Sequence, residues 1–259
     1  MKILVICQYY SPEPFKVADV CEALVEKGHE VDVVTSFPNY PMGKVYDGYK
    51  NSFHKEENIN GVNVHRVFTI GRKSGFLYRV VNYYAFSIAS SLFVNKLNKD
   101  YDVVFVYQLS PVLMAQAGVK YKKKHNKKLL LYCLDLWPDS LTLGGLKKGG
   151  PIYNYFKKKS VELVNIGCTI ILDWGFWSLE NRRSLTEFCR SQNVHCEWHY
   201  IDVDDRTWNK NIEERNLRVL NGEDGSDYYL DEGLMRKLLS IWEAPSKDAI
   251  DVWYTLERK

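Results

Sequence analysis

The stretch that decides the fold is residues 1–37, MKILVICQYYSPEPFKVADVCEALVEKGHEVDVVTSF. Lys2–Cys7 and Glu30–Thr35 are short apolar runs of the kind that form buried strands. The residues between them have the pattern of a helix. A strand, a helix and a second strand in this order predict a parallel pair joined by a crossover helix.

The helix inside this stretch has recognisable ends. Its apolar residues, at spacings of three and four, are Val17, Val20, Cys21 and Leu24. Ser11 and Pro12 predict its start, because a hydroxyl residue caps the first turn and proline suits its first position. Gly28 predicts its end.

The same alternation continues along the chain. Further strands are predicted at Val62–Phe68, Val103–Tyr107, Leu129–Leu134, Cys168–Asp173 and Cys196–Asp202. Further helices are predicted at Gly75–Asn98, Pro111–His125, Ile152–Ile166, Ser178–Gln192, Asp204–Leu220 and Asp231–Glu243. We therefore expect an α/β fold: a mostly parallel, Rossmann-like doubly wound sheet with crossover helices.

The composition divides the 259 residues into two pieces. Residues 1–160 carry 23 Lys and Arg against 13 Asp and Glu, whereas residues 161–259 carry 12 against 19. Of the seven Trp, only Trp137 lies in the first piece. This contrast predicts domains at 1–160 and 161–259. If the sheet runs on across the division, Cys168–Asp173 pairs beside Leu129–Leu134.

Cysteine usage and hydropathy narrow the class of protein. The six Cys are scattered with no Cys-x-x-Cys pair, which indicates small buried side chains in a reducing cytosol and no metal site. Val80–Val94 is uncharged but falls short of the ~20 apolar residues that a membrane span needs. It is interpreted as a long buried helix, with a helix lying on the membrane surface as the alternative.

The loop after the first strand lacks the glycines of a dinucleotide site. Gln8–Pro14 stands where Gly-x-Gly-x-x-Gly would allow the backbone to approach a pyrophosphate, which argues against such a site.

Four segments instead resemble a known family. Met1–Phe15, Leu24–Val31, Phe37–Tyr49 and Leu134–Leu141 are similar, in this order, to the N-terminal domain of family 4 glycosyltransferases with the GT-B fold. The nearest subgroup is the capsule, O-antigen and colanic-acid type, which has an Asp-Leu-Trp-Pro-(Glu/Asp)-Ser segment after its fifth strand.

The resemblance implies an acceptor-binding role for residues 1–160. Asp135, at the end of a predicted parallel strand, would orient or deprotonate the acceptor hydroxyl, unless it and Ser140 only cap the next turn. The residues expected to shape the acceptor cleft are Tyr9, Tyr10, Ser11, Glu13, Asn39, Tyr40 and Trp137.

Two clusters of basic residues indicate which kind of partner the chain could bind. Lys120–Lys128 and Lys147–Lys159 are rich in lysine, which is typical of solvated faces or of surfaces that attract anionic lipid headgroups. The sequence shows no pattern that would interleave aromatic residues with these lysines on one face, so we expect no nucleic acid partner. The expected partners are a lipid-linked saccharide acceptor or a membrane surface, and the oligomeric state stays open.

Residues 163–259 resemble a different family. They are similar to the C-terminal part of P-loop kinases of the AAA-like and zeta-toxin type, and the segments that carry the resemblance are Gly167–Arg183, His199–Val203, Arg215–Asn216 and Trp242–Ser246. By that resemblance Asp173, Arg206 and Arg215 would handle phosphates, with ATP and Mg²⁺ as cofactors. However, the sequence contains no Gly-x-x-x-x-Gly-Lys-(Ser/Thr), and phosphoryl transfer depends on that phosphate loop.

The resemblances together favour a glycosyltransferase-like protein of cell-surface polysaccharide synthesis. It would transfer sugar from a nucleotide sugar as co-substrate, with no covalently bound cofactor, and the absence of a donor-binding half puts activity in doubt. The alternatives are an ATP-dependent small-molecule kinase and an inactive fusion or truncation product. We expect a cytoplasmic location, and the alternative is peripheral attachment to the inner face of the membrane.

Overall fold

A computed structural model of the chain describes residues 1–71, 76–135, 138, 142, 147–173, 175–222 and 228–255. It divides into two compact units, Met1–Asp173 (unit 1) and Trp174–Lys259 (unit 2). Each unit is described by itself.

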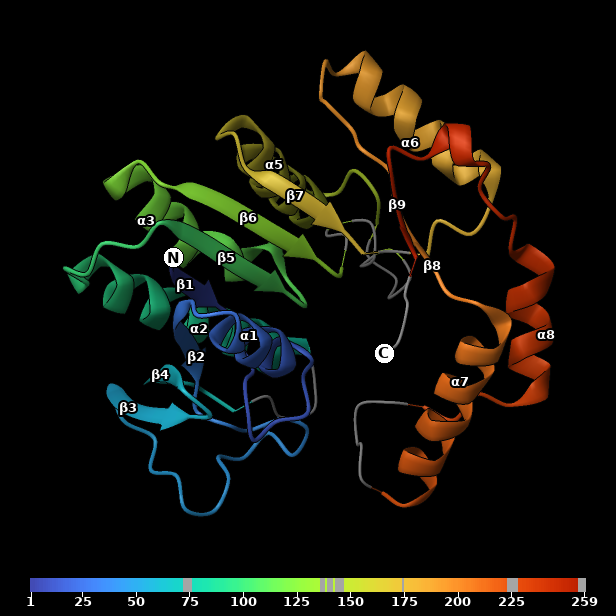
Figure 1. Cartoon of the computed structure of the whole chain (residues 1–259). Coiled ribbons are helices and arrows are strands. Elements are labelled where there is room, and N and C mark those ends of the chain that lie inside the picture. The colour runs from blue at the N-terminus through green and yellow to red at the C-terminus, as the bar shows by residue number, and fades with distance from the viewer. Residues whose placement is uncertain are drawn as a thin grey trace. The chain divides into compact units, whose positions relative to one another are not determined.

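Unit 1 is built on a seven-stranded sheet (Figure 1). Its strands are β1 (Lys2–Ile6), β2 (Glu30–Ser36), β3 (His54–Ile59), β4 (Val62–Val67), β5 (Val103–Gln108), β6 (Lys128–Cys133) and β7 (Thr169–Leu172). Their order is β3-β4-β2-β1-β5-β6-β7, and all neighbouring strands are parallel except β3 and β4. The expected mostly parallel, Rossmann-like α/β fold is confirmed.

Helices cover both faces of this sheet (Figure 1). They are α1 (Val17–Glu26), α2 (Phe76–Lys96), the 3₁₀ turn η1 (Val112–Ala115), α3 (Gln116–His125) and α5 (Pro151–Asn165). Helix α1 packs on one face, and α2 and α3 pack on the other. Within the described residues, no helix combines the length and the apolar character that crossing a membrane requires.

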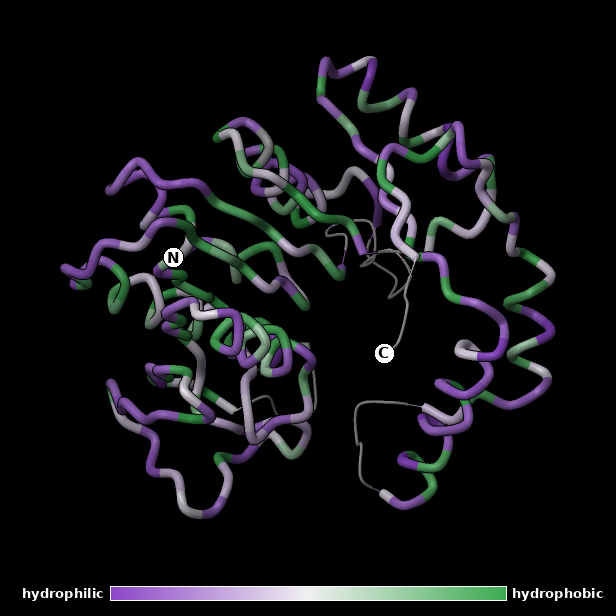
Figure 2. The backbone as a smooth tube through the Cα atoms, viewed as in Figure 1, coloured by the Kyte–Doolittle hydropathy of each residue, from purple (hydrophilic) through white to green (hydrophobic). Residues whose placement is uncertain are grey.

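The core follows from the alternation of side chains along each strand. On β1, Ile3 and Val5 pack with Val17 and Cys21 of α1, whereas Leu4 and Ile6 face the opposite helices. Figure 2 shows the hydrophobic residues that run along the middle of β5 and β6. Each fully buried aliphatic side chain of this kind contributes roughly 1.5–3 kcal/mol.

The first helix begins later than the sequence predicts. Helix α1 starts at Val17, its N-cap residue is Lys16, and no side chain caps it. Residues 11–16 instead form a loop, because the Glu13 carboxylate accepts hydrogen bonds that hold this segment against other loops. The expected helix start at Ser11 and Pro12 is therefore wrong.

Strand β7 continues the sheet of the first piece. It pairs in parallel with β6 from Leu130↔Thr169 to Cys133↔Leu172, which confirms the predicted pairing across the change of composition. The compact unit thus extends to Asp173, beyond the composition boundary near residue 160.

Strand β3 is absent from the prediction. Its sequence, His54–Ile59, is polar and mostly exposed, and it pairs antiparallel with β4 at the sheet edge. The two-residue turn Asn60–Gly61 has positive φ at both positions (51° and 84°), as a tight hairpin turn requires. This Asn-Gly pair is the sequence feature that predicts the hairpin.

Unit 2 has three helices and a small sheet among its described residues. The helices are α6 (Leu179–Ser191), α7 (Asp205–Leu220) and α8 (Glu232–Ile241), with the turn η2 (Lys247–Ala249). Ser178, Asp204 and Asp231 cap them by accepting hydrogen bonds from backbone N–H groups. Strands β8 (His199–Asp202) and β9 (Val252–Thr255) pair in parallel.

A buried carboxylate ties together several elements of unit 1. The side chain of Asp32 on β2 is only 3% exposed and accepts hydrogen bonds from Lys99 Nζ, Tyr101 Oη and Asn63 Nδ2. Burial opposes ionisation, but the hydrogen bonds outweigh it and hold the pKa of Asp32 well below its usual range. A buried charge that is this well paired is costly to remove.

We expect Asp32→Asn to lower the free energy of unfolding by about 3 kcal/mol, because Lys99 loses its buried counter-charge. Urea unfolding followed by circular dichroism measures this. Glu30→Gln is the matched control, since Glu30 also pairs with Lys99 but is exposed, and it should cost less than about 1 kcal/mol. Equal losses of unfolding free energy in the two variants would contradict the role of Asp32 as the buried counter-charge.

Candidate functional site

The reversal of strand order locates the candidate site. From β1 the sheet grows through β2 and β4 in one direction, and the chain then returns to build β5, β6 and β7 in the other. In open parallel sheets, ligands bind outside the carboxyl ends of the strands at this switch point. Here it lies between the ends of β1 and β5.

Two buried glutamines occupy those ends. Gln8 follows β1, and its Nε2 donates to Asn82 Oδ1 on α2 at 2.6 Å. Gln108 ends β5, and its Nε2 donates to the backbone oxygen of Asp135 at 3.1 Å. Among the described residues, Gln8 Oε1 has no hydrogen-bond partner, although Gln8 is fully buried. An unpaired buried acceptor costs about 1–3 kcal/mol, and a ligand donor would satisfy it.

Glu13 joins the two loops whose sequences carry the family resemblance. Its Oε1 accepts from the backbone N–H groups of Asn39 at 2.8 Å and Tyr40 at 2.7 Å. Its Oε2 accepts from the N–H of Tyr10 at 3.3 Å. The loop after β1 is therefore held against the loop after β2 by one carboxyl group.

Burial strongly affects the chemistry of this carboxyl group. Glu13 is 2% exposed, and burial raises its pKa to about 7, although the three backbone hydrogen bonds act to lower it. A carboxyl group with a pKa near neutral pH, in the loop that follows a parallel strand, is typical of functional sites.

Aromatic rings line the same loops. Tyr9 stacks on Phe15 with ring centroids 5.1 Å apart, and Tyr40 packs against both rings at 5.5 and 5.2 Å. Tyr9 and Asn39 are buried, whereas Tyr40 is partly exposed. Asn39 Nδ2 donates to the Phe37 backbone oxygen, which stiffens the second loop.

Two further predicted residues have backbone or core roles in the structure. Tyr10 is fully buried against the core cysteines, so its ring belongs to the packing under α1. Ser11 is partly exposed, and its backbone oxygen accepts from Arg66 on β4. Arg66 is itself buried and paired with Glu57 of β3.

Asp135 and Asp173 lie at the carboxyl ends of adjacent strands. Asp135 is partly exposed just after β6, where its backbone oxygen accepts from Gln108. Asp173 follows β7, and its carboxylate accepts a hydrogen bond from the Tyr132 hydroxyl. Trp137, also predicted here, lies outside the described residues.

The two arginines of the kinase-like prediction lie in unit 2. Arg206 is exposed near the start of α7, and Arg215 stacks on the ring of Tyr228 at 4.6 Å. Nine positions separate them, which on an α-helix places them on opposite sides. Helix α7 therefore does not present them as one phosphate-binding pair.

The sequence analysis missed the buried amides at the switch point. Asn82 bridges Gln8 to the backbone oxygen of Ile70, with Nδ2 donating at 2.6 Å. The sequence feature that could have identified it is an amide side chain within the uncharged run Val80–Val94. Its partner, more than seventy residues away, could be identified only from the folded sheet.

A hollow of about 180 Å³ lies between η1–α3 and α5 of unit 1. Its rim includes Lys123, Lys159 and Glu162, and none of the predicted site residues lines it.

Comparison with known proteins gives limited similarity. No protein-family model and no curated protein matches the chain. Among solved structures, it is similar to the catalytic domain of starch synthase IV from Arabidopsis thaliana bound to ADP and acarbose, at a TM-score of 0.38 and 12% identity, over 100% of this chain and 74% of that one.

Two trehalose-phosphate synthases are also similar. The UDP-forming enzyme from Burkholderia vietnamiensis has a TM-score of 0.36 and 11% identity, over 100% of this chain and 72% of that one. The enzyme from Burkholderia multivorans has a TM-score of 0.33 and 10% identity, over 100% and 73%. At these TM-scores the similarities define no family, and the fold class rests on the sheet itself.

The raised pKa of Glu13 predicts a pH-dependent stability. Between its usual pKa of 4.5 and about 7, the unfolded chain loses this proton while the folded chain keeps it. The free energy of unfolding should therefore fall by about 3 kcal/mol as pH rises through this window.

We expect Glu13→Gln to abolish this part of the pH dependence, as measured by urea unfolding at pH 5 and pH 8. Glu26→Gln, on the exposed end of α1, is the control that should keep it. If the free energy of unfolding of Glu13→Gln depends on pH as that of the parent chain does, the Glu13 carboxyl group ionises normally and the prediction is wrong.

Proposed function

We propose that the chain is a glycosyltransferase-like protein. In this proposal unit 1 binds the acceptor in the transfer of a sugar from a nucleotide sugar to a lipid-linked or saccharide acceptor. The observation that carries the proposal is the joining of two loops, Gln8–Phe15 and Phe37–Tyr49, by Glu13 beside the switch point. These loops contain the residues on which the resemblance to family 4 glycosyltransferases rests.

The chemistry assigned to Asp135 follows from its place. Its carboxylate would take the proton of the acceptor hydroxyl as the oxygen forms a bond to the anomeric carbon and the nucleoside diphosphate leaves. Asp135 lies partly exposed at a strand end, next to the buried Gln108, which fixes its backbone. A base on a rigid strand end is held in one position relative to the acceptor.

An apolar stripe on α2 supports a membrane-facing acceptor. The exposed side chains at spacings of three and four along the helix are Tyr78, Val81, Tyr84, Ile88 and Leu92. The Tyr84 hydroxyl lies 3.3 Å from that of Tyr155 on α5, where Ile152 is also exposed. Exposed apolar residues on neighbouring helices form a surface that lipid would cover.

Exposed lysines lie on the two helices that contact α2. Lys157 and Lys158 are exposed on α5, and Lys123 and Lys124 are exposed at the end of α3. Lys124 Nζ donates to the backbone oxygen of Asn95, near the end of α2. Each lysine close to an anionic membrane adds on the order of 1 kcal/mol of attraction.

A transfer assay tests the enzymatic part of the proposal. With radiolabelled UDP- or GDP-sugars and a polyprenyl-diphosphate-linked saccharide in micelles, Asp135→Asn should lower transfer at least about a hundredfold, because the base is lost. Asp173→Asn, the carboxylate at the end of the adjacent strand, is the control and should retain transfer.

Thermal-shift measurements of the whole chain separate this proposal from the kinase alternative. Stabilisation by UDP- or GDP-sugars supports sugar transfer. Stabilisation by ATP with Mg²⁺, and by no nucleotide sugar, would overturn it.

Vesicle sedimentation tests the membrane surface. Ile88→Glu combined with Leu92→Glu should weaken binding to phosphatidylglycerol-containing vesicles at least about tenfold, because two charged side chains replace apolar ones that contact lipid. Val20→Glu, an exposed apolar position on α1, is the control. Unchanged binding by the double variant would exclude α2 as the contact surface.

A further inference from the structure

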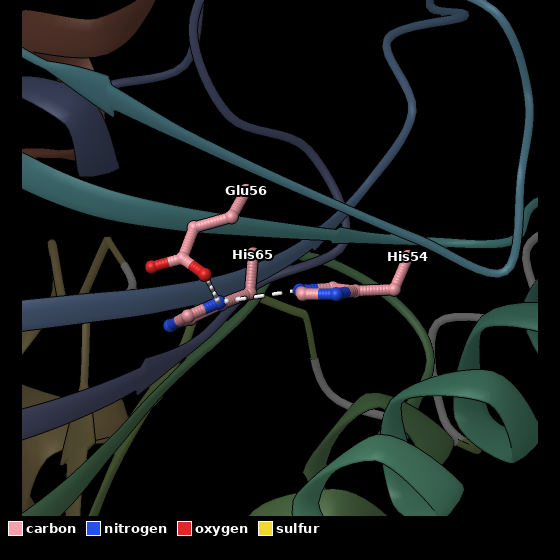
Figure 3. Close-up of side chains that lie close together, drawn as sticks. All are labelled: His54, Glu56 and His65. Atoms are coloured by element: carbon pink, nitrogen blue, oxygen red, sulfur yellow. Dashed lines mark hydrogen bonds and ion pairs between the residues drawn. The ribbon is translucent and has the colours of Figure 1, made fainter.

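The β3–β4 hairpin places three metal-binding side chains on one face (Figure 3). His54 and Glu56 are two residues apart on β3, so their side chains leave the same side of the strand. Glu56 is directly opposite His65 in the antiparallel register. The three side chains therefore converge on the face of the sheet that α2 covers.

The distances between their ligand atoms suit one small cation. His54 Nε2 lies 3.3 Å from His65 Nδ1, and Glu56 Oε2 lies 4.0 Å from the same Nδ1. One atom from each of the three residues lies within 4.8 Å of the other two. A tetrahedral Zn²⁺ with Zn–N bonds of about 2.0–2.1 Å separates its ligand atoms by about 3.3 Å.

The two histidines already have this spacing, and the glutamate needs only a small adjustment. The side chain of Glu56 is 62% exposed, so rotation about its bonds meets little packing. His65, in contrast, is 8% exposed and fixed. The site therefore has one rigid ligand from the core, His65, and one readily adjustable ligand from the sheet edge, Glu56.

The surroundings hold the imidazole rings in place. Phe93 of α2 packs against both rings, with centroid distances of 4.7 Å to His54 and 5.1 Å to His65. On the far side of His65, its Nε2 lies 3.8 Å from Asp32 Oδ2. This distance is longer than a hydrogen bond, but it puts a carboxylate on the side of the second ring nitrogen, where ligating histidines in metal sites usually have a carboxylate partner.

We propose that His54 Nε2, His65 Nδ1 and Glu56 Oε2 bind one divalent transition-metal ion of the Zn²⁺ class. Two imidazoles and a carboxylate are a ligand set that Zn²⁺ accepts, with a water molecule completing the tetrahedron. Because His54 and Glu56 are exposed, solvent reaches this fourth position. The site is separate from the acceptor chemistry assigned to Asp135, which lies at the end of β6.

The prediction that the chain has no metal site followed from its scattered cysteines and did not consider these histidines. The ligands come from both strands of a hairpin that the sequence analysis did not predict. Once Asn60–Gly61 closes the hairpin, residues eleven positions apart become diagonal neighbours on the same face.

A second histidine–glutamate group in unit 2 provides a matched control. Glu197 Oε1 lies 2.9 Å from His195 Nε2, and Glu197 Oε2 lies 3.4 Å from His199 Nε2. Unlike His54, Glu56 and His65, these three side chains do not bring one ligand atom each to within 4.8 Å of the other two.

Isothermal titration of the whole chain with Zn²⁺ tests the proposal, with one ion expected per chain. His54→Ala should weaken this binding at least about a hundredfold, and Glu56→Gln at least about tenfold. Both positions are exposed at the sheet edge, so circular dichroism should show unchanged folding. His195→Ala should bind as the parent chain does.

Cobalt(II) absorption distinguishes these ligands from the six free cysteines. The proposal predicts weak visible d–d bands without an intense thiolate charge-transfer band, and loss of these bands in His54→Ala. A thiolate band, unchanged affinity in His54→Ala, or lost affinity in His195→Ala would overturn the proposal.

Discussion

Strand β1 pairs in parallel with β2 on one side and with β5 on the other. The sheet grows from β1 in both directions, through β2 and β4 on one side and through β5, β6 and β7 on the other. At this reversal of strand order, the loops that follow β1 and β5 diverge. In open parallel sheets, ligands bind in the crevice between such loops. Gln8 and Gln108 end the two strands, and Glu13 then holds the loop after β1 against the loop after β2. The loop positions Tyr9, Asn39 and Tyr40, which are assigned to substrate binding, depend on this arrangement.

Much of the sheet could be predicted from the sequence. Buried parallel strands such as β1, β5 and β6 are short runs of apolar residues, and this hydrophobic pattern identifies them. Strand β3 could not be predicted in the same way, since its residues are polar and pair only because β4 offers a free edge. The predicted start of α1 was wrong for a related reason. A local cap at Ser11 competes with two long-range hydrogen bonds that Glu13 accepts from Asn39 and Tyr40, and the local sequence pattern does not contain these partners.

The polar residues inside unit 1 show what the rest of the candidate site depends on. Asp32, Glu13 and Gln8 are each buried, and each makes hydrogen bonds to segments far away in the chain. A charged or amide side chain is stable in such a place only when the whole fold supplies its partners. Residues that looked like substrate contacts from the sequence, Glu13 and Asn39 among them, are therefore also the ones that set the geometry of the loops.

Hydrogen exchange of the whole chain, with and without a polyprenyl-diphosphate-linked saccharide, tests the central claim most directly. The claim is that unit 1 binds its acceptor at the switch point between β1 and β5. We expect the acceptor to slow exchange in the loops Gln8–Phe15 and Phe37–Tyr49 and around Asp135, with unit 2 unchanged. Protection confined to α7 and the other elements of unit 2, or protection of neither loop, would contradict it.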